Sequence, residues 1–271
     1  MQRGSILISF DLEKAWGIHD SIGVDEYHDC LACGDENIKF ILTELQKYRL
    51  KSDWAFVGQM IEDDRALWRI DENTRELLKN PSVNHMSHSY SHLEYKVKNK
   101  EEVLSDYNRF KAVFPNIEGI IFPRNRFDQD ILNGVSDLGY RYFRDLSKFE
   151  RILNDLGVSR KLTKVLVALN SFIPIYSINS GISRYGNISG IESSLFIRLN
   201  VSRVMLLLQY LRIFLGIIVA VCFRHNVHLW MHPHNLCCSN RNRLYLSSLF
   251  RLLGFFVRKG MLRSQNMNTI I

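Results

Sequence analysis

The chain has 271 residues, of which 46% are hydrophobic and 23% are charged, with 15 glycines and 5 prolines. These values are typical of globular proteins and exclude a collagen-like or disordered chain. The formal net charge is +7, but residues 1–192 hold 25 basic and 28 acidic side chains, whereas residues 193–271 hold 10 basic and no acidic ones. Such a segment predicts a polyanionic partner (a membrane surface, a phosphate-bearing lipid or a nucleic acid) or else a solvated basic face.

Short runs rich in β-branched and aromatic residues alternate with segments whose apolar residues recur at helical spacing. The predicted strands are residues 6–10, 54–57, 83–86, 117–122, 140–143 and 227–231, and the clearest predicted helices are residues 38–45, 103–113 and 131–138. This βαβα order favours an α/β fold, either a parallel sheet or a (β/α) barrel. In both, functional residues lie at the C-terminal ends of the strands.

The cysteines and the N-terminus suggest a compartment. The apolar run of residues 5–10 is too short for a secretory signal and lacks a small-residue cleavage site. Five cysteines do not resemble the framework of a small secreted domain, and the CxxC of Cys30 and Cys33 has no second CxxC to complete a zinc site. We therefore expect free thiols, Cys222, Cys237 and Cys238 included, in a cytoplasmic protein, with peripheral association at the inner membrane as an alternative.

Two apolar segments lie in the second half of the chain. Residues 204–223 are long enough to span a bilayer, but Gln209 and Arg212 interrupt them, and a central charge costs roughly 2.5 to 3.5 kcal/mol on insertion scales. We therefore expect a buried core helix. Residues 239–260 begin with a capping serine and predict a basic helix that either closes the fold or lies on a membrane. We expect one domain, residues 1–271, in which residues 151–223 form an unassigned helical insertion.

Two histidines and two carboxylates predict a metal site. His88 and His92 are four residues apart, so that one helical turn would direct both at one cation. Asp11 and Glu13 follow the first predicted strand at alternate positions, which share one face of an extended chain. One carboxylate can bind a metal while the other remains free as a base, and two imidazoles with one carboxylate leave open positions for water and substrate. The alternatives are a chance histidine pair and a solvated loop.

Polar clusters follow two further predicted strands. Arg124 comes after residues 117–122 and can hold a carboxylate in bidentate fashion. His232 comes after residues 227–231 and can donate a proton near neutral pH. Each side chain has a structural alternative, an arginine that caps a helix or a histidine bonded to the backbone.

Taken in order, these segments resemble the polysaccharide deacetylases, carbohydrate esterase family 4, also called the NodB homology domain. The likeness rests on Ser9-Phe10-Asp11, His88-Ser89-x-x-His92, Phe122-Pro123-Arg124 and Leu229 to His232. They are similar, in turn, to the start of the T-F-D-D-G motif, to H-[ST]-x-x-H, to the arginine motif and to the late L-x-x-H motif. The second Asp of the first motif is Leu12 here, and we expect Glu13 to replace it.

The resemblance implies a distorted (β/α) barrel of about seven parallel strands. It also implies that Glu13, His88 and His92 hold a divalent ion, with zinc expected first and other transition metals as alternatives. The ion would lower the pKa of bound water and polarise an amide carbonyl. The expected reaction removes an N-acyl group, above all N-acetyl, from an amino sugar in a glycan or lipid-linked glycan.

The same resemblance assigns the remaining roles. Asp11 is expected to accept the proton of water, Arg124 to orient Asp11, and His232 to protonate the departing amine. Substrate contacts are expected from Trp16, His234 and Asn235, the last two of which can instead orient His232. The Asp11-Leu12-Glu13 start with Trp16-Gly17, together with the final His-Pro-His-Asn, looks like the branch often found with bacterial surface-polysaccharide synthesis.

Two other functions compete with the deacetylase, and nucleic-acid binding is a weaker third option. A deformylase or another small-amide hydrolase would use the same metal site. A catalytically silent protein would bind glycan or an anionic membrane through the basic C-terminal part, and the loss at Leu12 favours it. Nucleic acid is not expected as a partner, because leucine rather than exposed aromatic platforms interleaves the basic segment.

Overall fold

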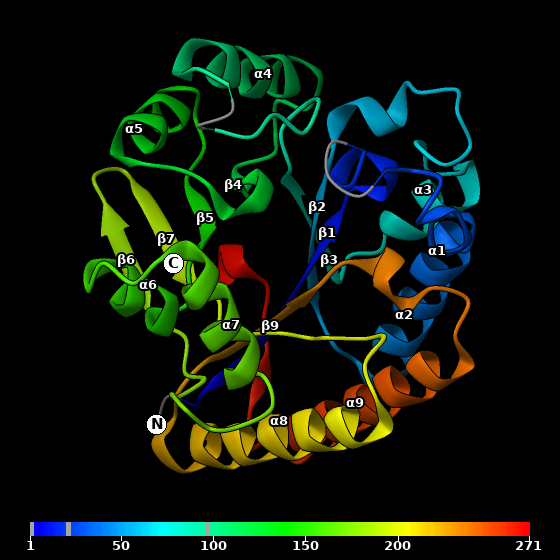
Figure 1. Cartoon of the computed structure of the whole chain (residues 1–271), viewed down its shortest axis with the longest axis vertical. Helices are drawn as coiled ribbons and strands as arrows, with labels where there is room; N and C mark the ends of the chain where they lie inside the picture. Colours follow the sequence, from blue (N-terminus) through cyan, green and yellow to red (C-terminus); the bar gives the residue numbers. More distant parts are fainter. Residues whose placement is uncertain (1–2, 20–22, 96–97) are drawn as a thin grey trace.

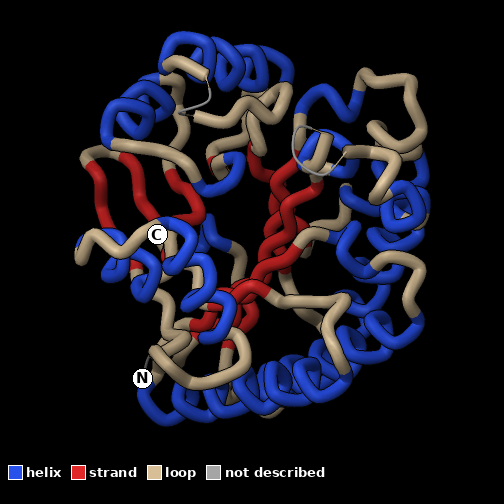
Figure 2. The backbone as a smooth tube through the Cα atoms, in the orientation of Figure 1, coloured by secondary structure: helices blue, strands red, loops and turns tan. Residues whose placement is uncertain are grey.

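The computed structural model describes residues 3–19, 23–95 and 98–271. Its centre is a curled sheet in which ten described strands follow the order β6-β7-β5-β4-β3-β2-β1-β9-β8, with β10 beside β1. Every pair is parallel except β6 with β7. Helices surround the strands on the outside (Figures 1 and 2). The predicted α/β barrel class is therefore confirmed.

The elements begin and end as follows. The strands are β1 Ser5–Leu12, β2 Ser52–Phe56, β3 Val83–Ser87, β4 Gly119–Ile120, β5 Tyr142–Asp145, β6 Ile182–Tyr185, β7 Ile188–Glu192, β8 Leu195–Phe196, β9 Val227–Met231 and β10 Arg263–Ser264. The α-helices are α1 His28–Ala32, α2 Gly34–Tyr48, α3 Glu72–Leu78, α4 Lys100–Val113, α5 Gln129–Asp137, α6 Lys148–Asp155, α7 Arg160–Asn170, α8 Arg203–Phe223 and α9 Asn240–Arg258. Short 3-10 helices include η1 Lys14–Gly17 and η4 Pro233–Leu236.

The predicted strands and helices are all found, although β4 keeps only two residues of the predicted 117–122. Residues 151–223, expected as a helical insertion, also contribute β6, β7 and β8 to the sheet. Ser193 N donates to the Asp145 carbonyl (3.0 Å) and Ser194 N donates to the His228 carbonyl (2.8 Å). The segment 188–196 thus runs from β5 to β9 and links the two sides of the curled sheet.

Strand β1 explains where the polar site lies. All its residues are buried, as expected for a central parallel strand covered on both faces. Ile6, Ile8, Phe10 and Leu12 share one apolar cluster with the surrounding helices, whereas Leu7 packs in a separate cluster with residues of neighbouring strands. The odd-numbered positions therefore face the barrel interior, and Asp11 follows Leu7 and Ser9 on that side.

A buried carboxyl on β2, Asp53, makes stability depend on pH. Asp53 accepts hydrogen bonds from Asn84 Nδ2 (2.6 Å) and Met267 N (3.1 Å), but burial outweighs them and raises its pKa to about 7. In the unfolded chain the carboxyl loses its proton near pH 4, so between about pH 4 and 7 the folded state holds a proton that the unfolded state has lost. The contribution of Asp53 to the unfolding free energy is therefore greatest below about pH 4, and it falls as the pH rises from about 4 to 7.

We expect Asp53→Asn to remove that loss, because the amide stays neutral at every pH. Against the variant, the wild type should lose about 1.4 kcal/mol of unfolding free energy for each pH unit between about 4 and 7. Urea unfolding of both proteins at pH 5 and pH 8 measures the difference. Parallel profiles for the two proteins would show that Asp53 stays ionised in the fold.

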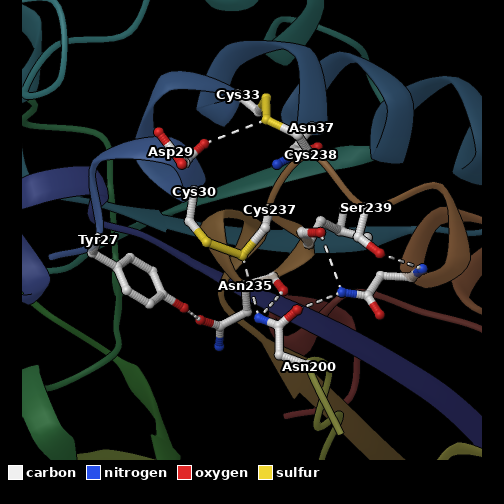
Figure 3. The surroundings of a disulfide bond; sticks show 12 residues. Tyr27, Asp29, Cys30, Cys33, Asn37, Asn200, Asn235, Cys237, Cys238 and Ser239 are labelled. Carbon is white, nitrogen blue, oxygen red and sulfur yellow. Dashed lines mark hydrogen bonds between the residues drawn. A yellow bond between two sulfur atoms is a disulfide. The ribbon is translucent and has the colours of Figure 1, made fainter. Parts of the chain in front are cut away.

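Two disulfides overturn the prediction of free thiols. Cys30 is bonded to Cys237 and Cys33 to Cys238 (Figure 3). Cys222 is free and exposed. Cys30 lies on α1 and Cys33 directly follows it, and the chain returns after η4 with two adjacent cysteines opposite them. Neither pairing can be read from the spacing, because it depends on where the late segment docks. The cysteines therefore no longer support a reducing compartment.

Candidate active site

A pocket of about 440 Å³ opens at the C-terminal ends of β1 and β9. The side chains of Asp11, Glu13, His92 and His232 line it together with residues from α7 and from the segment after β8. Clustered polar groups at this edge of a parallel barrel are the arrangement expected of a catalytic site.

Glu13, His88 and His92 converge beside this pocket. Glu13 Oε2 lies 3.1 Å from Nε2 of His88 and 3.1 Å from Nε2 of His92. All three side chains are buried, and one ligand atom from each lies within 4.8 Å of the others. Two imidazole nitrogens and one carboxylate oxygen are a donor set that zinc accepts, so the residues present fit a divalent ion.

The backbone that carries the two histidines is a loop, not the predicted helical turn. Strand β3 ends at Ser87, and Ser89 and His92 then take positive φ angles of 62° and 58°. The Asp106 carboxylate on α4 accepts hydrogen bonds from the backbone N–H groups of Tyr90 (2.8 Å) and Ser91 (3.1 Å). The fixed loop brings the histidines together, whereas the prediction assumed regular helical geometry.

The outer nitrogen of His88 is held in place. Its Nδ1 lies 2.7 Å from the Ile121 carbonyl, to which it can donate, and this leaves the Nε2 lone pair facing Glu13. Such a backbone contact fixes the tautomer of a metal-binding histidine. His92 Nδ1 is buried and has no hydrogen-bond partner among the described residues. Burial lowers the pKa of His92 and so favours the neutral imidazole that metal binding requires.

Glu13 reaches the histidines because of the turn that follows β1. A Cβ atom at Gly17 would lie 2.1 Å from Cδ of Glu13, so only glycine leaves room for this carboxylate. Lys14, buried at a φ of 44°, anchors the turn through Asp35 (2.8 Å). Burial raises the pKa of Glu13, but His232 and the paired histidines outweigh it and hold the pKa well below its usual value. Leu12, on the opposite face, lies in the outer apolar cluster.

Arg144, not Arg124, holds Asp11. Arg144 Nη1 donates to Asp11 Oδ1 (2.5 Å) and Nη2 donates to Oδ2 (2.7 Å), and both side chains are buried. Burial raises the pKa of Asp11, but the Arg144 guanidinium outweighs burial and keeps the pKa well below its usual value. Arg124 instead pairs with Glu94 (3.0 Å) at the pocket wall, so the expectation that it orients Asp11 is wrong.

His232 faces both carboxylates. Its Nε2 lies 3.4 Å from Asp11 Oδ2 and 3.6 Å from Glu13 Oε1. Burial lowers the pKa of His232, but the two carboxylates outweigh it and raise the pKa above its usual value. The imidazole is therefore positioned and charged as a proton donor would be.

A family model described as polysaccharide deacetylase matches residues 24–143, which include His88, His92 and Arg124. Over these residues the chain matches the polysaccharide deacetylases. The match supports a hydrolase that acts on carbon–nitrogen bonds, with carbohydrates as the general class of substrate. Asp11, Glu13 and His232 lie outside the matched residues, so their roles rest on the geometry alone. No curated protein matches the chain in sequence.

Solved structures share the deacetylase fold at low sequence identity. A putative polysaccharide deacetylase from Mycobacterium smegmatis is 10% identical with a TM-score of 0.58, over 97% of this chain and 93% of that one. A carbohydrate esterase family 4 pseudoenzyme from Bacillus anthracis is 11% identical with a TM-score of 0.52, over 99% and 65%. A 4-alpha-glucanotransferase from Thermococcus litoralis is 11% identical with a TM-score of 0.60, over 99% of this chain but only 40% of that one.

None of the three residues expected to bind substrate is among the residues that line the pocket. Trp16 is buried against Trp68, with ring centroids 4.9 Å apart. His234 is buried and stacks on His232 at 5.3 Å, and burial lowers its pKa to about 4. Asn235 Nδ2 lies 3.4 Å from His232 Nδ1, and its Oδ1 accepts a hydrogen bond from Tyr27 (2.9 Å; Figure 3). The contacts of His234 and Asn235 favour their alternative role, orientation of His232.

The sequence patterns did not indicate two contributors to the site. Arg144 holds Asp11, and the Trp230 ring centroid lies 4.0 Å from the guanidinium carbon of Arg144. Arg144 directly follows the predicted strand 140–143, so the rule that strand ends carry function could have found it. Trp230 lies inside a predicted strand and gave no such signal.

Proposed function

We propose that this protein is a metal-dependent deacetylase that removes the N-acetyl group of an amino sugar, with zinc as its ion. The observation that carries the proposal is the convergence of Glu13, His88 and His92 beside an Arg144-bound Asp11. The match to the deacetylase family model supports the reaction class, and the buried donor atoms support a catalytic rather than a silent protein.

Glu13, His88 and His92 would hold the ion. When bound, a divalent ion lowers the pKa of water and polarises the amide carbonyl. Asp11, kept ionised by Arg144, would accept the proton that water loses as it attacks. Because Arg144 holds both carboxylate oxygens of Asp11, the base is fixed before the substrate arrives.

His232 would complete the reaction. An amine leaves the tetrahedral intermediate readily only when it receives a proton. The raised pKa of His232 favours the protonated ring, and Asn235 contacts the other ring nitrogen, Nδ1 (3.4 Å). Asp11 would thus act as the base and His232 as the acid, and the two side chains lie next to each other, with His232 Nε2 3.4 Å from Asp11 Oδ2.

The pocket wall supports an anionic group on the substrate. Arg160 and Lys164 of α7 and Arg198 after β8 line the pocket beside Asp11. The Arg198 Nε is buried and has no hydrogen-bond partner within the described part of the chain. Clustered cations favour phosphate or carboxylate, so we propose a glycan with a phosphate near the amino sugar, as in a phosphate-linked lipid glycan.

We expect His232→Ala to lower the turnover of an N-acetyl amino-sugar substrate by about 10²-fold or more, because the departing amine loses its proton donor. Bound metal should stay at the wild-type level, since His232 is not part of the proposed ligand set. Acetate release and metal analysis of the same preparation measure both quantities.

The control is His228→Ala, which removes a buried imidazole on β9, the strand that His232 follows. This imidazole contacts Ser9 (2.8 Å) and is not within hydrogen-bond distance of Asp11 or Glu13. Wild-type turnover in His232→Ala would remove this residue from the reaction. Parallel assays with N-acetyl and N-formyl amino sugars, free and phosphate-linked, test the acyl group and the anion. Faster release of formate would favour the deformylase alternative.

A further inference from the structure

Helix α8 buries the two polar residues of its central part and exposes a row of apolar side chains. Gln209 and Arg212, the two residues that interrupt its apolar sequence, are both buried. Arg212 Nε donates to the Asn170 carbonyl (3.2 Å), and Gln209 Oε1 accepts a hydrogen bond from Tyr245 (2.9 Å). Their polar groups are therefore satisfied within the protein, and the expected buried core helix is buried on one face only.

The outward face of α8 is apolar along its whole length. Eight of its large apolar side chains are between 37% and 67% exposed, namely Val204, Leu207, Leu208, Leu211, Leu215, Ile218, Val219 and Phe223. From Val204 to Val219 they recur at helical spacing, and a helix of 21 residues is about 30 Å long. We call these eight residues the α8 face. A continuous apolar surface of this length is unusual on a soluble monomer and marks a surface that binds something apolar.

The surroundings of the α8 face are basic. Between residues 193 and 271 no acidic residue occurs. Helix α9 packs beside α8 through Tyr245, along the lower edge of the molecule in Figure 1. The exposed side chains of α9 and of Lys259, which caps its C-terminus, include Arg241, Arg251 and Arg258 together with Leu244 and Phe255. An apolar stripe bordered by arginine and lysine is complementary to a bilayer with anionic headgroups.

Helix α8 has the length and hydropathy of a membrane span, but its inner face is occupied. Leu206, Ile213, Ile217 and Ala220 lie in the main apolar core, and Arg212 is bonded to the end of α7. The helix cannot cross a bilayer without breaking these contacts. It can lie in the plane of the interface, with one face in lipid and the other on the domain.

We propose that the α8 face docks this protein onto the surface of an anionic lipid bilayer, with the cations of α9 at the headgroups. The apolar surface continues from α8 to Ile173 and Ile175 after α7, which are about half exposed. Helix α7 also carries Arg160 and Lys164 of the pocket. Docking would therefore place the pocket near the membrane, but the proposal depends only on the α8 face and not on the proposed reaction.

A second copy of the chain is the other occupant to consider. Two α8 faces packed together would bring two acid-free basic segments against each other, and like charges across an interface oppose association. An anionic bilayer suits both helices, because its apolar layer can cover the α8 face while its headgroups neutralise the cations of α9. The charge pattern therefore favours the bilayer.

The test is flotation of the full chain with vesicles of phosphatidylcholine, with and without phosphatidylglycerol, at low salt. We expect binding to vesicles that contain phosphatidylglycerol. Leu211→Gln with Leu215→Gln should lower the partition coefficient by about tenfold or more, because two leucines no longer enter the apolar layer. The matched control is Leu77→Gln with Val113→Gln, two side chains of similar exposure (44% and 45%) on α3 and α4, which lie away from α8 in Figure 1.

The control variant should float like the wild type, and both variants should keep the wild-type unfolding temperature. Failure of the wild type to float at low salt would overturn the proposal, and so would equal flotation of the two variants. Analytical ultracentrifugation tests the second copy. If the protein binds no vesicles but forms a dimer that the two leucine substitutions dissociate, the α8 face is a self-association surface.

Discussion

The Glu13→Ala variant is expected to purify with less than about a tenth of the metal bound by the wild type and to lose deacetylation by about 10³-fold or more. Glu13 Oε2 lies 3.1 Å from the Nε2 atoms of both histidines and would be the only anionic ligand of the proposed ion. Without it, two neutral imidazoles remain, and their affinity for a divalent ion is low. Metal analysis and acetate release on the same preparation measure the two losses.

Glu150→Ala is the matched control for this prediction. Glu150 lines the same pocket from α6, and no contact joins it to His88 or His92 among the described residues. Its loss should leave the metal content unchanged. If Glu13→Ala keeps stoichiometric metal, the ligand set is wrong, whatever the activity. If the wild type itself binds no divalent metal, the result favours the alternative function, in which the protein is catalytically silent and binds glycan or membrane.

Much of this site could be predicted because it depends on periodicity. Alternate residues of a strand share one face, so the pattern of the sequence alone predicts that Asp11 and Glu13 lie together and that Leu12 points away from them. The structure agrees, with Leu12 among the helices and both carboxylates in the interior. The strand order placed His88 and His232 at the same end of the barrel for the same reason.

Other features depend on contacts between distant segments and could not be predicted. The loop that contains Ser89 and His92, with their positive φ angles, is held by hydrogen bonds to Asp106 on helix α4. The disulfides depend on where the segment after η4 docks. The burial of Arg212 required its carbonyl partners on the neighbouring segment, so hydropathy alone could not show which face of α8 points outward.

The two arginines illustrate the difference between a motif and a contact. Arg124 occupies the expected place in the sequence, yet it pairs with Glu94 and its side chain is 31% exposed. Arg144 has no motif to mark it, yet its side chain is 1% exposed and it holds Asp11 through two hydrogen bonds. An ion pair that excludes water should be more sensitive to the loss of one partner than a pair at the surface.

Arg144→Ala is therefore expected to lower the unfolding free energy by about 3 to 5 kcal/mol, because it leaves the Asp11 carboxylate buried and unpaired. Deacetylation should fall by about 10²-fold or more, since the base loses the group that fixes it. Arg124→Ala should cost about 1 kcal/mol or less, as for a partly exposed ion pair. Urea unfolding and acetate release, measured on both variants, compare the two arginines directly.

A double variant separates position from stability. Asp11→Asn with Arg144→Ala removes both charges of the pair, so most of the lost unfolding free energy should return. Activity should not return, because the amide cannot accept a proton. Recovery of both would mean that Arg144 serves only to neutralise a buried charge and that another group is the base. An equal loss of activity in Arg124→Ala would instead restore the arginine that the motif indicates.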